Sequence, residues 1–105
     1  MLEKLKSIFG MGTNIDFAKL KKEGAVILDV RSPSEYAAGH IIDSINIPVD
    51  ELGKNLTKLK DKNKPVITCC ASGMRSATAK NILKAYGYAN VYNGGGWQSL
   101  NQKIK

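Results

Sequence analysis

Two apolar runs separated by helical segments constrain the fold of this chain more than any other feature. The first spans residues 25–30 and reads AVILDV, and the second spans residues 65–69 and reads PVITC. Continuous apolar runs rich in β-branched residues are typical of strands that are buried on both faces, as in a parallel sheet. Parallel strands need long crossover connections, which are usually helices. The pattern therefore predicts an α/β fold with a mainly parallel sheet flanked by helices.

Apolar residues at helical spacing supply the expected crossovers. The strongest helix is predicted over residues 76–86, ending at Gly87, and its apolar face is formed by Ala79, Ile82, Leu83 and Tyr86. Shorter helices are predicted after the N-caps Asp16 and Ser34, along the stripe Leu52, Leu56 and Leu59, and over residues 97–102. Further short strands are predicted at 13–15, 44–47 and 90–92, with a turn over 93–96.

The length of 105 residues fits one domain with a single core. We expect residues 1–12 to form an N-terminal extension and residues 13–105 to form the globular domain. The first ten residues carry charges at positions 3, 4 and 6 and have no continuous apolar stretch. We therefore expect neither a secretory signal nor a membrane span there, and their apolar spacing fits a short helix on the domain surface.

The chain is basic, with 16 Lys and Arg against 9 Asp and Glu and a net charge of +7. Much of the excess lies in residues 54–64, where five lysines face one aspartate. The simplest interpretation is a solvated surface, and the alternatives are attraction of small anionic substrates or of acidic partner proteins. No interleaved aromatic residues accompany the lysines, so we expect no nucleic-acid partner.

The two cysteines, Cys69 and Cys70, are adjacent. Neighbouring residues of a strand point to opposite faces, so they form no ordinary disulfide, and with the single histidine, His40, they cannot complete a four-ligand zinc site. We expect no metal site and a reducing compartment, the cytoplasm. By the alternation, Cys69 points into the core, and the alternative is a resolving thiol that attacks an oxidised or persulfidated Cys70.

The loop at 70–76, CASGMRS, lies between the second apolar run and the strongest helix. Thiolate is the reactive form of cysteine, and positive surroundings lower the thiol pKa. Three sources of positive potential converge on Cys70: the N-terminus of the helix, the backbone N–H groups of a loop that Gly73 allows to curl, and the guanidinium of Arg75. The pattern predicts a nucleophilic cysteine in an anion-binding cup. The alternative for Arg75 is a surface ion pair with a carboxylate.

This loop resembles the active-site loop of the rhodanese-type sulfurtransferases. Residues 28–41, LDVRSPSEYAAGHI, resemble the N-terminal signature of that family, and residues 44–48, SINIP, continue it. Residues 94–97, GGGW, resemble its end motif. Four motifs in the right order are far more specific than one. The resemblance spans residues 13–102 and implies the single-domain, three-layer rhodanese-like fold, with a five-stranded and mainly parallel sheet flanked by helices.

The resemblance implies the reaction as well. Cys70 takes a sulfane sulfur from thiosulfate or a persulfide donor, becomes a persulfide, and passes the sulfur to cyanide or to a thiol or protein acceptor, without a metal or organic cofactor. The donor is a small anion. Ala71 departs from relatives with a larger or charged residue there, which leaves Arg75 as the one charged side chain within the loop. The implied substrate-binding residues are Arg75, Ala71, Ser72, Gly73, Met74 and Ser76.

Two other functions are alternatives to turnover as a sulfurtransferase. One is a persulfide carrier or sensor that delivers sulfur to a partner protein. The other is a phosphatase or arsenate-reductase-like activity. Four residues separate Cys70 from Arg75, whereas the cysteine phosphatases that use a similar cradle have five. A shorter loop makes a smaller cup, which fits a phosphate ester poorly.

Other residues of these motifs are interpreted as structural. Asp29 and Arg31 end a buried strand, and we expect an ion pair or hydrogen bond that braces the loops, with direct substrate contact as the alternative. His40 is the lone histidine, and a structural role is preferred to general-base catalysis. Trp97 is expected to pack in the core, with the pocket mouth as the alternative.

Overall fold

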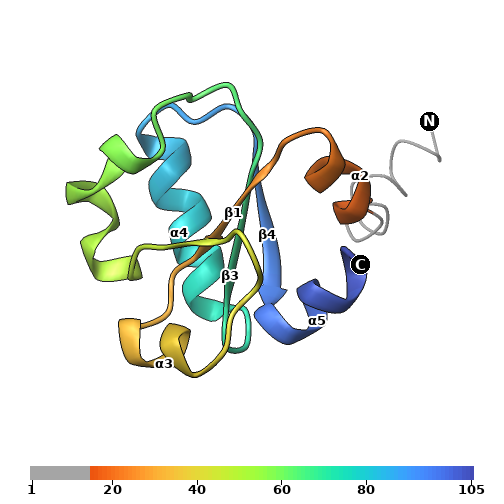
Figure 1. The fold of residues 1–105 in the computed structure, drawn as a ribbon. Helices are drawn as coiled ribbons and strands as arrows, with labels where there is room; N and C mark the ends of the chain where they lie inside the picture. The colour runs from red at the N-terminus through yellow and green to blue at the C-terminus, as the bar shows by residue number, and fades with distance from the viewer. Residues whose placement is uncertain (1–14) are drawn as a thin grey trace, which may run out of the picture.

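The computed structural model describes residues 15–105, and its centre is a parallel sheet of four strands in the order β2-β1-β3-β4. The strands are β1 (Val26–Asp29), β2 (Ile45–Asn46), β3 (Val66–Cys70) and β4 (Val91–Gly96). The register pairs Leu28 with both Ile45 and Thr68, and Val66 with Val91. The α/β class and the parallel sheet are therefore confirmed (Figure 1).

The number of strands differs from the prediction of five. Four strands lie within residues 15–105. Of the short strand expected at 13–15, positions 13 and 14 lie outside the described residues, and Ile15 belongs to no strand. The extension at 1–12 and its surface helix also lie outside the described residues.

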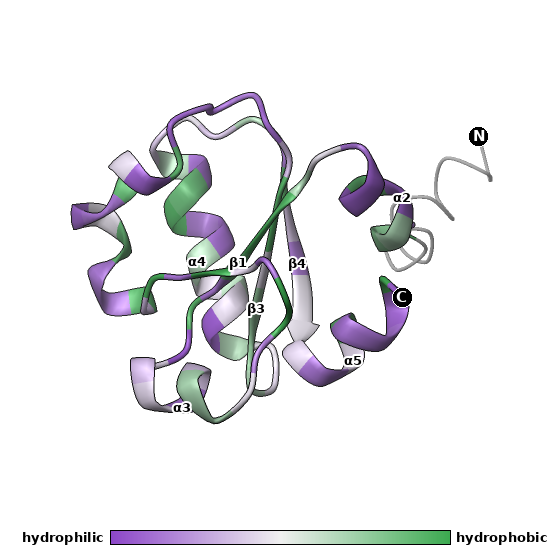
Figure 2. Cartoon of the chain, viewed as in Figure 1, coloured by the Kyte–Doolittle hydropathy of each residue, from purple (hydrophilic) through white to green (hydrophobic). Residues whose placement is uncertain are grey.

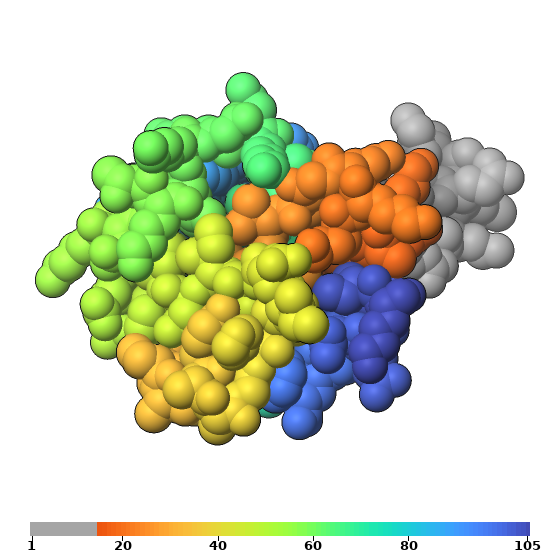
Figure 3. Space-filling view, in the orientation of Figure 1, coloured from red at the N-terminus to blue at the C-terminus, as the bar shows by residue number. Residues whose placement is uncertain are grey.

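Helices cover both faces of the sheet and make three layers. One face carries α4 (Met74–Ala85) with the 3-10 helices η2 (Val49–Lys54) and η3 (Leu56–Lys58), and the other carries α2 (Phe17–Lys22) and α5 (Trp97–Lys103). The short helix α3 (Pro33–Ala38) lies at the end of the sheet where β1 and β3 finish (Figure 1). In Figure 3, α3 and the segment that follows it form the lower part of the visible surface, beside α5.

The alternation of side chains along β3 divides the core into two clusters. Val66 and Cys70 belong to the cluster under α4, whereas Ile67 and Cys69 belong to the cluster under α2 and α5. Strands β1 and β3 are apolar along almost their whole length, as Figure 2 shows, because both of their faces are covered. The opposite orientation of the two cysteines follows directly from this period of two.

Several local predictions need correction. The leucine stripe after Val49 forms two 3-10 helices rather than an α-helix, although Leu52 and Leu59 are buried as expected. The N-cap of α3 is Ser32 and not Ser34, because Pro33 fits the first helical position and Ser32 completes a capping box with Glu35. Helix α4 begins two residues earlier than expected.

The glycines after Tyr92 continue β4 instead of forming the predicted turn. Their small size is what permits the continuation. A Cβ atom at Gly94 would lie 2.8 Å from side-chain atoms of Ile67 and Leu100 and from the carbonyl oxygen of Thr68. A Cβ at Gly96 would lie 3.0 Å from the carbonyl oxygen of Ala71, in the loop at 70–76. Glycine at 94 therefore lets β4 pack closely against β3 and α5, and glycine at 96 lets it pack closely behind the loop.

We predict that Gly94→Ala lowers the free energy of unfolding by about 1–3 kcal/mol, because the added methyl group overpacks the core. Urea denaturation followed by circular dichroism measures the change. Gly53→Ala is the matched control: its Cβ would meet, at 3.2 Å, the hydroxyl oxygen of Tyr86, an exposed side chain that can move aside. Equal stability losses in the two variants would contradict the close packing inferred for β4.

Candidate active site

The candidate site is the turn that joins β3 to α4. Strand β3 ends at Cys70 and α4 begins at Met74, so three residues reverse the chain. Gly73 makes this possible as the N-cap of α4, with φ 111° and ψ −16° in the left-handed region. A residue with a side chain rarely adopts that conformation without strain. The turn places the sulfur of Cys70 directly before the N-terminus of a twelve-residue helix.

Backbone N–H groups surround the sulfur. The N–H of Gly73 donates to Cys70 Sγ at an N···S distance of 2.9 Å, and the N–H of Ser76 donates to it at 3.3 Å. Burial of Cys70 opposes ionisation, but hydrogen bonds from the side chain and backbone of Ser76 and from the backbones of Gly73 and Ser72 outweigh it. The net effect lowers the pKa of Cys70 below that of an ordinary thiol.

Ser76 is held in place from both sides of the turn. Its hydroxyl lies 2.6 Å from Asn93 Oδ1 and 2.9 Å from the carbonyl oxygen of Gly73, and its own carbonyl accepts a hydrogen bond from Thr68 Oγ1 at 2.9 Å. A hydroxyl has one hydrogen, so it serves one acceptor at a time, and the thiolate of Cys70 is a further acceptor. Strands β3 and β4 thus fix the position from which Ser76 acts on the sulfur.

Cys69 lies in a different environment from Cys70. Its side chain belongs to the cluster under α2 and α5, and it is 0% exposed. Burial raises the pKa of Cys69 to about 12. Both cysteines are free thiols. A thiol that is buried and protonated is chemically inert, so the two neighbouring sulfurs differ in reactivity because they face opposite sides of the sheet.

Arg75 forms an ion pair at the rim of the cup. Its Nη1 and Nη2 atoms lie 2.8 and 3.0 Å from the two carboxylate oxygens of Glu35, which is on α3. This two-point contact raises the pKa of Arg75 and lowers the pKa of Glu35 to about 2. The sequence predicts that Arg75 binds an anion, with an ion pair to a carboxylate as the alternative, and in this structure the guanidinium is paired with Glu35.

Asp29 and Arg31 form a buried ion pair at the end of β1. Arg31 Nη2 lies 2.7 Å from Asp29 Oδ2, and Arg31 Nε lies 2.9 Å from Asp29 Oδ1. Arg31 also donates to the carbonyl oxygens of Gly39, the C-cap of α3, at 2.7 Å and of Glu35, within α3, at 3.3 Å, which ties α3 to the end of β1. Because the hydrogen bond to Asp29 outweighs burial, the pKa of Arg31 is raised. The guanidinium further lies 4.7 Å from the ring centroid of Trp97.

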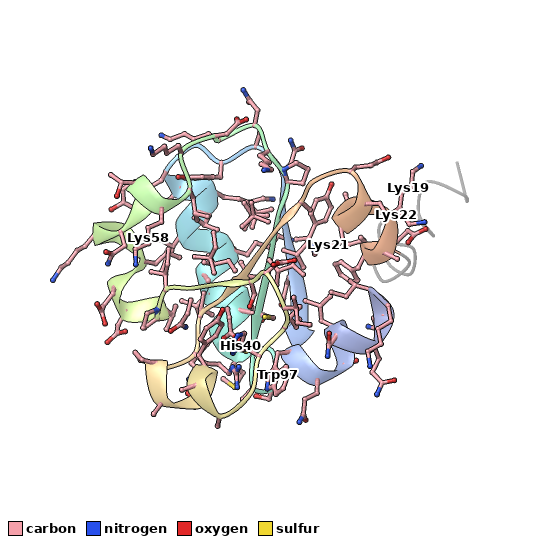
Figure 4. All side chains as sticks on the ribbon, in the orientation of Figure 1. Lys19, Lys21, Lys22, His40, Lys58 and Trp97 are labelled. Carbon is pink, nitrogen blue, oxygen red and sulfur yellow. The ribbon has the colours of Figure 1, made fainter. Side chains whose placement is uncertain are left out.

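His40 and Trp97 lie at the same end of the molecule as α3, as Figure 4 shows. His40 stacks on Tyr36 at a ring-centroid distance of 3.8 Å, and its Nδ1 lies 2.7 Å from the carbonyl oxygen of Tyr36. Trp97 is half-buried between Arg31 and Gly39. Both contacts are with protein groups rather than with the sulfur of Cys70.

The structure brings together most of the residues singled out from the sequence. Gly73 and Ser76 contact the sulfur of Cys70, whereas the side chains of Ala71, Ser72 and Met74 are exposed and can contribute backbone groups to the cup. Three residues were missed: Glu35, Thr68 and Asn93. A capping-box pattern, serine followed three residues later by glutamate, marks Glu35, but it gives no sign that the carboxylate reaches Arg75.

Among residues 15–105, no group of three or more His, Cys, Asp and Glu side chains is placed to hold a metal ion. Over the same residues, no helix is long and apolar enough to cross a membrane.

Comparison with known proteins identifies the fold and the family. The family model for the rhodanese-like domain matches residues 13–103. The thiosulfate sulfurtransferase PspE of Escherichia coli K12 is 39% identical over 74 residues, which cover 70% of this chain and 71% of PspE. A putative mitochondrial thiosulfate sulfurtransferase of Schizosaccharomyces pombe is 37% identical over 97 residues, covering 79% and 68% of the two chains.

Solved structures agree with the sequence comparisons. A rhodanese with anions from E. coli superposes with a TM-score of 0.69 at 38% identity, covering 72% of this chain and 91% of that chain. A reduced Bacillus anthracis protein, CoADR-RHD, gives a TM-score of 0.69 at 34% identity, covering 89% of this chain and 16% of that larger chain. The chain therefore belongs to the rhodanese-like domain family, and its relatives support a sulfurtransferase within that family.

Proposed function

We propose that this protein is a sulfurtransferase that moves a sulfane sulfur from thiosulfate or a persulfide donor to a thiol or to cyanide, with Cys70 as the nucleophile. The observation that carries the proposal is the sulfur of Cys70, held by the N–H groups of Gly73 and Ser76 at the N-terminus of α4. These donors stabilise a thiolate, and they also suit the terminal sulfur of a persulfide, which carries the same negative charge.

In the first half of the reaction the Cys70 thiolate attacks the outer sulfur of thiosulfate. A bond forms between Cys70 Sγ and that sulfur, the S–S bond of the donor breaks, and its electron pair leaves with sulfite. In the second half the acceptor attacks the outer sulfur of the persulfide, and the electron pair of that bond returns to Cys70. The step needs no redox partner, because the sulfane sulfur is passed on without a net change in oxidation state.

The burial of the nucleophile limits what can react with it. Cys70 is 1% exposed, so the reacting atom must enter the cup at the end of a narrow group, as a terminal sulfur can. We infer that backbone groups of Ala71, Ser72, Gly73, Met74 and Ser76 hold this atom, with Arg75 at the rim.

A persulfide carrier that serves a partner protein remains the second candidate, and one observation favours it. Met74, the first residue of α4, is 81% exposed at the edge of the cup. An exposed and flexible apolar side chain beside a reactive sulfur suits contact with another protein. Slow turnover with thiosulfate, combined with rapid acceptance of sulfur from a persulfidated protein, would favour the carrier over the enzyme.

We predict that Cys70→Ser reduces thiocyanate formation from thiosulfate and cyanide to the uncatalysed rate, because serine provides no thiolate. Brief exposure to thiosulfate should add one sulfur atom to the wild-type protein, cyanide should remove it, and mass spectrometry of the intact chain detects both changes. Cys69→Ala, which alters the buried neighbour, should retain the activity. Full activity of Cys70→Ser would overturn the proposal.

We also predict that the reactivity of Cys70 persists to lower pH than that of an ordinary thiol and falls as the pH drops through its lowered pKa. Ser76→Ala removes the hydroxyl that lowers the pKa of Cys70 and keeps the backbone N–H that donates to the sulfur, so the pH midpoint should move up by about one unit. The rate of alkylation by iodoacetamide against pH measures this midpoint in a Cys69→Ala background.

Thr78→Ala is the control for this experiment. It removes an exposed hydroxyl from the same helix, where Thr78 Oγ1 donates to the carbonyl oxygen of Met74, and should leave the midpoint unchanged. Thermal denaturation checks that Ser76→Ala remains folded. An unshifted midpoint in folded Ser76→Ala would show that this residue does not stabilise the thiolate.

A further inference from the structure

Arg75 is the one charged side chain of the active-site loop, and its guanidinium is already bound by the carboxylate of Glu35. Both terminal nitrogens of the guanidinium bind a carboxylate oxygen of Glu35, at 2.8 and 3.0 Å. The two side chains are 38% and 37% exposed, so the pair lies at the protein surface, whereas Cys70 is buried. An anionic donor that uses Arg75 must therefore compete with a carboxylate already bound in a favourable two-point geometry.

Glu35 is itself fixed in this position. Its Oε1 accepts hydrogen bonds from the backbone N–H of Ser32 at 3.1 Å and from the hydroxyl of Ser32 at 3.0 Å. The first of these bonds, with the backbone N–H of Glu35 that donates to Ser32 Oγ at 3.3 Å, forms the capping box of α3. The hydrogen bond from Arg75 is the largest of the effects that lower the pKa of Glu35 to about 2. The carboxylate is thus charged near neutral pH, and there it opposes the charge of Arg75.

The attraction of the cup for anions then comes from two unequal parts. The N–H groups of Gly73 and Ser76 point at the sulfur and are permanent partial charges. The guanidinium of Arg75 adds little to the attraction for anions, because the carboxylate of Glu35 neutralises its charge. Backbone dipoles suffice for one negative charge at the reacting sulfur, whereas a second charge at the outer end of the donor meets a neutral ion pair.

We propose that Glu35 is a specificity-determining residue: by holding Arg75 it disfavours dianionic sulfur donors relative to donors with a single negative charge. The proposal rests on the sulfurtransferase function proposed above. Glu35 acts through Arg75, so it is a positioning residue and not a catalytic one.

Two donors with the same reacting atoms and different charge test the proposal. Thiosulfate is a dianion, and benzenethiosulfonate is a monoanion in which a phenyl group replaces one oxygen. In each case the Cys70 thiolate attacks the terminal sulfur and the S–S bond breaks. The electron pair leaves on the sulfur of sulfite or of benzenesulfinate, and the same Cys70 persulfide remains.

We predict that Glu35→Gln raises the ratio of kcat/KM for thiosulfate to kcat/KM for benzenethiosulfonate by roughly 2- to 5-fold, the scale expected for a partly exposed ion pair. The change should appear as a lower KM for thiosulfate at nearly constant kcat. Glutamine also completes a capping box, so the variant removes the charge and keeps the cap of α3. Thermal denaturation verifies that the fold is retained.

Two comparisons isolate the ion pair. Glu51→Gln removes the same charge from a neighbouring position, since Glu51 and Arg75 line one cavity of about 350 Å³ but form no ion pair. This control should leave the donor ratio unchanged. In an Arg75→Gln background, Glu35→Gln should have no effect on the ratio, because no guanidinium remains to be released.

The outcomes separate this proposal from the one on which it rests. If the wild-type protein transfers sulfur but the donor ratio is the same in Glu35→Gln, the role of Glu35 is overturned and the sulfurtransferase function stands. A ratio that changes equally in Glu51→Gln, or in the Arg75→Gln background, also overturns the role of Glu35. Absence of a Cys70 persulfide with either donor would overturn both proposals.

Discussion

The short turn from β3 to α4 is the constraint on which the site depends. Three residues must reverse the chain between Cys70 and Met74, and the left-handed backbone of Gly73 allows this. The same reversal brings the N–H groups of Gly73 and Ser76 to the sulfur. The lowered pKa of Cys70 therefore arises from the backbone N–H groups that the turn presents, together with the side chain of Ser76. The close packing of Gly96 behind Ala71 supports the turn from β4.

The sheet supplies the second constraint, because it decides which groups meet at this turn. Successive side chains of β3 point to opposite faces of the sheet, so Cys70 lies in the cluster under α4 and Cys69 in the opposite cluster. The pKa values of the two adjacent thiols are therefore shifted in opposite directions. The parallel pairing of β1 with β3 ends both strands at the same edge. Arg31, anchored on Asp29, then ties α3 to that edge and brings Glu35 within reach of Arg75.

Much of this could be predicted from sequence, and the failures have physical causes. The apolar runs at 25–30 and 65–69 predicted buried parallel strands correctly, because a strand covered on both faces needs apolar residues at nearly every position. The 3-10 geometry after Val49 and the continuation of β4 through Gly94 depend on tertiary contacts, which local propensity does not contain. The cup around Cys70 follows from local chain geometry. The bond from Arg75 to Glu35 joins residues forty positions apart and is invisible to motif spacing.

The paired state of Arg75 also bears on product release. Sulfite, the leaving group from thiosulfate, is a dianion like its donor, so a free guanidinium would hold product as well as substrate. Interactions that bind the substrate and the transition state equally lower KM without raising kcat. The N–H groups at the sulfur behave differently, since they act on the thiolate and on the persulfide through which the proposed reaction passes. Because Glu35 neutralises Arg75, the attraction of the site for negative charge is concentrated at the sulfur of Cys70, where the S–S bond of the proposed reaction forms and breaks.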